Sequence, residues 1–119
     1  MESFKLVLPE HLNHYGYLFG GNLLKWVDES AYIAARNEFP KLEFVTVAMD
    51  KVEFKKRVHL GAILRFEVER GRVGTTSAHY EVQVFVNQSD VDAAGPIFST
   101  TVTFVCIDQH GRKRTVEGR

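Results

Sequence analysis

Hydrophobic and polar positions follow two different periods along this chain, and the change of period divides it into elements. Between residues 22 and 39 the apolar positions recur every three or four residues, which predicts an amphipathic helix. The repeating positions are Leu23, Val27, Ala31 and Ala34. Because Pro40 disfavours α conformation at the residue before it, the helix is expected to end there after about 16–17 residues. Small residues in its second half predict that another element packs closely against it.

The rest of the chain carries strand patterns. A short apolar run over residues 4–8 stops at Pro9, and after Leu42 the period is two. This alternation predicts strands over residues 44–54, 63–70, 76–86 and 98–107. The first of these slips phase near Asp50 and Lys51, which predicts a β-bulge there. The last is apolar on both faces at its end, which predicts a central strand covered on both sides.

The predicted element order is therefore β-α-β-β-β-β. The later strands are joined by short connections, which favour antiparallel pairing. A polar loop is expected over residues 87–96, and a polar, frayed tail after a turn at residues 108–111. One helix cannot cover a flat sheet of five strands. We therefore expect an α+β fold in which a curved five-stranded antiparallel sheet wraps one long central helix and meets a second subunit at an edge.

Composition limits the classes of protein to consider. With 119 residues, the sequence is expected to form a single domain over residues 1–119. Lys plus Arg and Asp plus Glu are 15 each, and this balance argues against bulk binding to nucleic acid or an anionic membrane. No apolar run approaches the roughly 18 residues of a membrane span, and no leader is recognised. The single cysteine, Cys106, excludes an internal disulfide, so a cytoplasmic protein is expected.

The stretch from residue 13 to residue 28 concentrates unusual residues. Asp28 would lie two turns into the predicted helix, beside apolar neighbours. Partial burial would raise its pKa and prepare it to act as a base or nucleophile. The alternative is a solvent-facing carboxylate that forms an acidic pair with Glu29.

Gly20 and Gly21 immediately precede the predicted helix, where Asn22 alone or with Gly21 is expected to cap it. Unpaired N–H groups and a positive dipole end are found at such a position, and glycine lets a ligand approach them. Aimed at a carbonyl, these donors would form an oxyanion hole. A tight loop-to-helix turn explains the glycines equally well.

Asn13 could orient a water or donate to a carbonyl, or it could be a turn residue. The five histidines are scattered, without metal-ligand spacing, so neither a metal nor another cofactor is expected. Basic residues cluster at positions 55–57 and 112–114, each after a strand end. They would either grip a phosphate or simply solubilise a turn and a tail.

Taken together and in order, these residues resemble the hotdog-fold acyl-CoA thioesterases, specifically the brain-type acyl-CoA hydrolases and their small bacterial relatives. The likeness rests on a motif and the helix that follows it: Asn13, Gly16, Phe19, Gly20, Gly21, Leu24 and Asp28. It extends to later matches at residues 45–47, 54, 57–61, 74–77, 103–105 and 108–112. Val58 stands where the family usually has Pro, and His11 and Leu12 stand where relatives often carry an acidic or small residue and a Thr.

The resemblance implies dimers that share a continuous sheet, often assembled into hexamers, and hydrolysis of acyl-CoA to a free acid and CoA. In the family, the carboxylate at Asp28 is the general base or nucleophile, and the Asn at Asn13 lies across the dimer interface from it. Gly21 with Gly20 polarises the thioester carbonyl. The remaining residues expected to contact substrate are Phe19, Val45, Thr46, Lys55, Arg57, Thr76, Ser77 and Arg112.

Two other functions stay open on this scaffold. A hotdog hydratase or dehydratase needs an Asp–His type pair, and the helix offers Asp28 without a His at a neighbouring turn. A non-catalytic acyl-CoA-binding or sensing protein would use the same groove but would leave Asp28 without a role.

Overall fold

The computed structural model describes residues 1–87 and 95–116. Its elements follow the predicted order, with one short 3₁₀ turn added between the first strand and the helix. They are β1 (Glu2–Leu6), η1 (Pro9–His11), α1 (Gly20–Glu38), β2 (Glu43–Phe54), β3 (Ile63–Val73), β4 (Ser77–Val86) and β5 (Phe98–Ile107). Most of the loop predicted over residues 87–96 lies outside the described residues.

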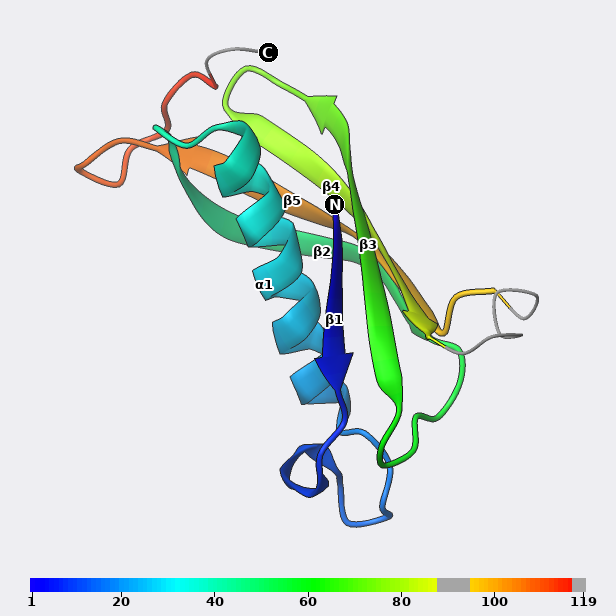
Figure 1. The fold of residues 1–119 in the computed structure, drawn as a ribbon. Helices are drawn as coiled ribbons and strands as arrows, with labels where there is room; N and C mark the ends of the chain where they lie inside the picture. The colour runs from blue at the N-terminus through cyan, green and yellow to red at the C-terminus, as the bar shows by residue number, and fades with distance from the viewer. Residues whose placement is uncertain (88–94, 117–119) are drawn as a thin grey trace.

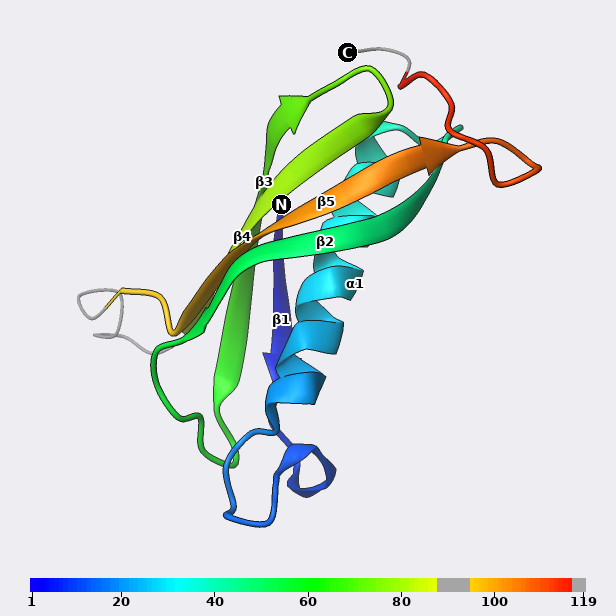
Figure 2. The same ribbon diagram turned by 180° about the vertical axis from the view of Figure 1, so that it is seen from behind.

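The five strands form one sheet in the order β1-β3-β4-β5-β2, and every neighbouring pair is antiparallel. Figures 1 and 2 show α1 lying along one face of this twisted sheet. The predicted α+β architecture is confirmed. Because β1 and β2 are the outermost strands, each leaves one backbone edge without a strand partner among the described residues.

The core lies between α1 and the sheet. The strands contribute alternate apolar side chains, such as Phe66, Val82 and Phe104, each at most 1% exposed. On the helix side Ala31 and Ala35 are fully buried, so the small residues do allow close packing of its second half. No helix of the described part of the chain is both long and apolar enough to cross a membrane.

The helix begins earlier than its periodicity indicates. It runs over 19 residues from Gly20, with Phe19 rather than Asn22 or Gly21 at the N-cap. The backbone N–H groups of Asn22 and Leu23 donate to Phe19 O, at 3.0 and 3.3 Å, and so close the first turn. The sequence prediction was wrong here because glycine has poor helix propensity, which the surrounding structure overrides.

Strand β2 carries the predicted bulge. Its register with β5 shifts between Asp50 and Glu53, and Lys51 adopts a left-handed conformation with φ of 55°. A second shift, between Thr46 and Ala48, was not predicted. These irregularities bend the long edge strand so that it follows the curved sheet.

The predictions for the last strand and the tail were wrong. β5 lies next to the edge strand β2, and alternate residues are buried on one face and only half-buried on the other. Apolar residues on its outer face therefore reflect an uncovered surface in this chain, not a covered centre. The tail is fastened as far as Val116, whose N–H donates to Thr75 O at 2.8 Å and which is 1% exposed.

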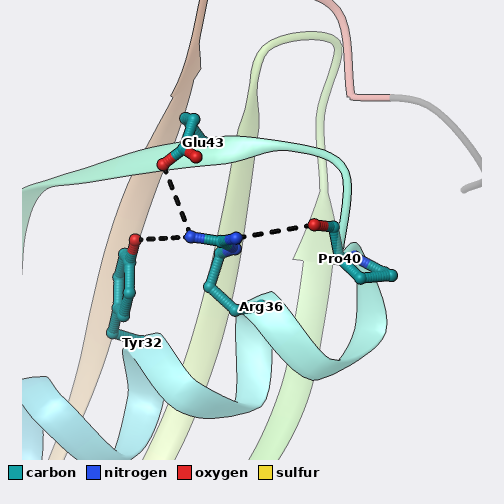
Figure 3. Close-up of polar contacts among 4 residues, drawn as sticks. All are labelled: Tyr32, Arg36, Pro40 and Glu43. Carbon is teal, nitrogen blue, oxygen red and sulfur yellow. Dashed lines mark hydrogen bonds and ion pairs between the residues drawn. The ribbon is translucent and has the colours of Figure 1, made fainter.

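Side chains fasten the C-terminal half of α1 to its surroundings. Nη1 of Arg36 donates to the Tyr32 hydroxyl at 3.0 Å and lies 3.4 Å from Oε2 of Glu43, and Nη2 donates to Pro40 O at 3.5 Å (Figure 3). Nearby, the Tyr80 hydroxyl donates to Oε1 of Glu38 at 2.6 Å. The helix is thus anchored at this end by polar contacts as well as by apolar packing.

Candidate active site

The first turn of α1 is built from glycine. Neither Gly20 N–H nor Gly21 N–H forms a hydrogen bond with any described residue, and the Phe19 cap supplies no side-chain acceptor. A Cβ on Gly21 would stand 2.8 Å from Cε2 of Phe19, and one on Gly20 would stand 3.3 Å from Cζ of Phe54. Two aromatic rings therefore flank a pair of backbone donors at the positive end of the helix dipole.

Asn13 shapes the loop before the helix. Its Oδ1 accepts hydrogen bonds from the N–H groups of Tyr15 at 2.9 Å and Tyr17 at 3.1 Å, and its own N–H donates to Tyr17 O at 2.7 Å. Its Nδ2 donates to no described residue. Asn13 is thus a turn residue, as one of the two hypotheses held, and it also keeps an amide donor available.

A cleft of about 800 Å³ opens beside these residues. It is lined by Asn13, Tyr15, Tyr17, Leu18, Gly20, Leu23, Phe54, Lys55, Lys56, Arg57 and Val58. The guanidinium of Arg57 lies 5.0 Å from the centre of the Tyr17 ring. This cation–π contact holds Arg57 in place beside the other two cations of the cleft, Lys55 and Lys56. Cations beside aromatic and apolar walls suit a ligand with both anionic and apolar parts.

Asp28 lies elsewhere, in the seam between α1 and the edge strand β2. It is half-buried, and Oγ1 of Thr46 donates to its Oδ1 at 2.7 Å. Thr46 faces the helix because its Cα partner in β5 is Phe104, which is a buried core residue. The hydroxyl fixes one carboxylate oxygen, and no described residue donates a hydrogen bond to Oδ2.

The spacing along the helix separates these two groups within one chain. Asp28 follows Gly21 by seven residues, which places it on the same face but roughly 10 Å farther along the axis. An oxyanion donor must lie about 3 Å from the carbonyl oxygen, and a base must lie within hydrogen-bond reach of the attacking water, or about 3 Å from the carbonyl carbon if it attacks directly. Within one chain the two groups are therefore too far apart to contact the same carbonyl directly.

The remaining predicted residues are distributed over both ends of the sheet. Lys55 and Arg57 line the cleft, whereas Val45 points away from the helix, opposite to Thr46, and is 42% exposed. Ser77 is the first residue of β4, Thr76 lies immediately before it, and Arg112 lies beyond the end of β5. Figure 1 shows this end of the sheet beside the end of α1, opposite to the glycine turn. They are not brought to the cleft, and their role in binding stays a prediction.

Sequence reasoning did not assign Tyr17 to the site and named Lys56 only as part of the basic cluster, although both line the cleft. The basic run at residues 55–57 was the available signal for Lys56. Asn22, expected as a cap, instead donates from Nδ2 to His11 O at 3.0 Å. Within residues 1–87 and 95–116 no three His, Cys, Asp or Glu side chains are grouped so that they could hold a metal ion.

Comparison with known proteins assigns the family. Residues 15–93 match the model of the thioesterase superfamily, and the chain belongs to that family. An uncharacterized acyl-CoA thioester hydrolase of Haemophilus influenzae is 30% identical over 93% of this chain and 73% of its own length.

Two solved structures extend this comparison. A hexameric hotdog fold thioesterase of Campylobacter jejuni is 32% identical with a TM-score of 0.83, covering 97% of this chain and 88% of its own. An acyl-CoA hydrolase of Staphylococcus aureus, solved with butyryl-CoA, CoA and CoA disulfide, is 29% identical with a TM-score of 0.83, covering 98% of this chain and 68% of its own. Its structure is also known with an Asn, an Asp or a Thr replaced by Ala. The fold of this chain is therefore the hotdog fold.

Proposed function

We propose that this protein hydrolyses acyl-CoA thioesters in a site shared by two subunits. Asp28 of one subunit and the Gly20–Gly21 donors of its partner would flank one thioester carbonyl. The observation that carries the proposal is the Asp28–Thr46 contact, 2.7 Å long, in a seam beside an unpaired strand edge. It supplies an oriented carboxylate at the place where a second subunit would meet the chain.

The free edge of β2 supports this assembly. The strand runs over 12 residues, is outermost in the sheet, and exposes 56% of Val47. A long edge with apolar side chains is normally covered, and an isologous pairing of two β2 strands would cover both copies at once. Such pairing would bring the partner's helix toward Asp28. Because the Campylobacter jejuni relative is hexameric, we further propose a hexamer built as a trimer of dimers.

The cleft at the helix start suits CoA. Lys55, Lys56 and Arg57 would neutralise phosphates, while Tyr17 and Phe54 offer apolar contact to the rest of the ligand. The Staphylococcus aureus relative binds butyryl-CoA and CoA. Its replaced Asn and Asp are also fifteen positions apart, as Asn13 and Asp28 are here. The buried Cys106 is compatible with a cytoplasmic protein.

The reaction follows from these positions. The carbonyl oxygen would accept hydrogen bonds from the partner's first-turn N–H groups, which stabilise the negative charge that develops on it. Asp28 would remove a proton from water as the water oxygen bonds to the carbonyl carbon. The C–S bond would then break, and the departing thiolate would regain the proton, leaving a free acid and CoA.

Direct attack by Asp28 is the alternative route, through a mixed anhydride that water then opens. A single turnover in ¹⁸O-labelled water supports direct attack if label appears in Asp28, because only attack by water on the aspartyl carbonyl of the anhydride places it there. Thr46 holds Oδ1 in either case and leaves Oδ2 available for attack or for proton transfer.

The proposed function is tested by replacing Asp28. Release of CoA from a series of acyl-CoAs would be followed with a thiol reagent for wild type, Asp28→Asn, Asn13→Ala and the neighbouring control Glu29→Gln. We expect wild type and the control to be active and Asp28→Asn to lose ~10²-fold or more of kcat, as for a lost acid–base group.

Equal activity of wild type and Asp28→Asn would overturn the assignment of Asp28. Tight binding of acyl-CoA without release of CoA would instead indicate a sensing protein. Gel filtration of the same samples tests the shared site, since an active monomer contradicts it.

A further inference from the structure

The start of α1 is weak by its own sequence. Its first two positions are glycines, which have a much lower helix propensity than alanine. Its N-cap, Phe19, offers no side-chain acceptor, and the absence of such a cap destabilises the helix end further. A helix end of this kind frays unless something outside the helix holds it, yet its N–H groups are the ones proposed to meet the thioester.

One carbonyl outside the helix supplies that hold. His11 O accepts the backbone N–H of Phe19 at 2.9 Å and the side-chain amide of Asn22, through Nδ2, at 3.0 Å. Phe19 caps the helix and Asn22 is its third residue, so the two hydrogen bonds bracket Gly20 and Gly21. The two glycines are therefore fixed from both sides without any use of their own N–H groups.

His11 is itself fixed in place. Its Nδ1 accepts the N–H of Leu8 at 3.0 Å, and its N–H donates to Leu8 O at 2.9 Å. Its ring meets the ring of Trp26 edge-on, with centroids 4.8 Å apart, and Trp26 is 6% exposed on the buried face of α1. His11 therefore contacts the second turn of α1 through its ring as well as the first turn through its carbonyl.

Asn22 has no other assigned part in the site. It does not line the cleft, and it lies on the helix between the glycines and Asp28. We infer that Asn22 is a positioning residue, which holds the Gly20 and Gly21 donors in place through the carbonyl of His11. This inference rests on the proposed thioesterase function.

The test removes the amide donor in two ways. Asn22→Ala deletes the side chain, and Asn22→Leu keeps its approximate volume and improves helix propensity, so that a folded protein is retained. Asn37→Ala, near the other end of the same helix, is the matched control. CoA release gives kcat and KM, thermal unfolding gives Tm, and hydrogen–deuterium exchange reports on the backbone of residues 18–24.

For both Asn22 variants we expect kcat to fall by ~10-fold or more, since small displacements of catalytic groups have large effects on rate. KM should stay within about twofold, because CoA is held elsewhere. Exchange should accelerate over residues 18–24, while Tm of Asn22→Leu stays at or above that of wild type. Asn37→Ala should resemble wild type in all three readouts.

Unchanged kcat in Asn22→Leu, with an active wild type, would overturn the inference while leaving the thioesterase function intact. A loss of activity that follows a fall in Tm in both variants would also overturn it, since it would mark a purely structural role. An inactive wild type would instead refute the proposed function itself.

Discussion

The two ends of α1 are built in opposite ways. At its start, two backbone donors are unpaired among the described residues, the cap has no side-chain acceptor, and the rings of Phe19 and Phe54 are 55% and 52% exposed. At its end, the Phe39 N–H donates to Ala35 O at 2.9 Å. The side chains there also form polar contacts with one another: Arg36 with Tyr32, and Glu38 with Arg70 and Tyr80. One end leaves hydrogen-bonding capacity for a ligand, and the other uses it for stability.

This difference separates function from stability along a single helix. A change at the end of α1 should lower the free energy of unfolding and leave catalysis intact. At the start of α1 the same helix should tolerate, or even gain from, changes that impair catalysis. The contrast between the two ends would be wrong if substitutions at both ends changed stability and activity in the same direction.

The largest effect is expected for Tyr80→Phe, at the end of the helix. Its hydroxyl donates to the Glu38 carboxylate at 2.6 Å from a side chain that is fully buried. A hydrogen bond to a charged group contributes about 1.5–3 kcal/mol, so unfolding in urea should show a loss of about 2 kcal/mol. CoA release measured below the unfolding transition should match that of wild type, and a parallel fall in kcat would contradict the separation.

The same residue gives a pH dependence. Burial, and next the hydrogen bond to Glu38, raise the pKa of Tyr80 above its ordinary value. The folded state then keeps this proton at a pH where the unfolded chain has already lost it. The resulting stability is fully present below about pH 10, the ordinary tyrosine pKa, and is lost as pH rises above it. Wild type should lose stability more steeply than Tyr80→Phe between pH 9 and pH 11.

Gly21→Ala should have a smaller effect, with opposite signs for stability and activity. The new methyl would meet the Phe19 ring 2.8 Å away, but that ring is exposed and can rotate aside. Alanine in place of helical glycine stabilises by roughly 0.5–1 kcal/mol. The methyl and the displaced ring would crowd the donors, so kcat/KM should fall ~10-fold, about 1.4 kcal/mol. Lys25→Ala, exposed on the same helix, is the control, and a destabilised but fully active Gly21→Ala would contradict the expectation.

Much of the fold could be predicted from hydrophobic periodicity. The strand over residues 98–107 was placed to the residue, because turn residues bound it on both sides. The position of this strand in the sheet was not predicted correctly, because the sequence of an apolar outer face is the same whether or not a second layer covers it. The start of α1 was missed because helix propensity predicts loop at Gly20 and Gly21, and two of the hydrogen bonds that override it are made to His11 O, outside the helix.

The candidate site divides in the same way. Asn13, Gly20, Gly21 and Asp28 were identified because unusual residue types concentrate before and within one helix. The separation of Gly21 from Asp28 follows from their spacing along the helix, whereas the cleft that Asn13 and Gly20 share with the basic residues depends on the three-dimensional course of the chain. The contact between Asn22 and His11 could not be predicted, because a backbone carbonyl leaves no signature in the residue type that carries it.

The smallest effect is expected for Glu43→Gln, at the same end of the helix as Tyr80→Phe. Glu43 Oε2 lies 3.4 Å from Nη1 of Arg36, but its side chain is 62% exposed (Figure 3). An exposed ion pair contributes about 0–1 kcal/mol, and salt screens what remains. The variant should lose at most about 0.5 kcal/mol in urea unfolding at low salt and nothing measurable in 1 M NaCl. A loss as large as that of Tyr80→Phe would mean that the polar contacts at this end act as one network. The burial of each contact would then not determine how much stability it contributes.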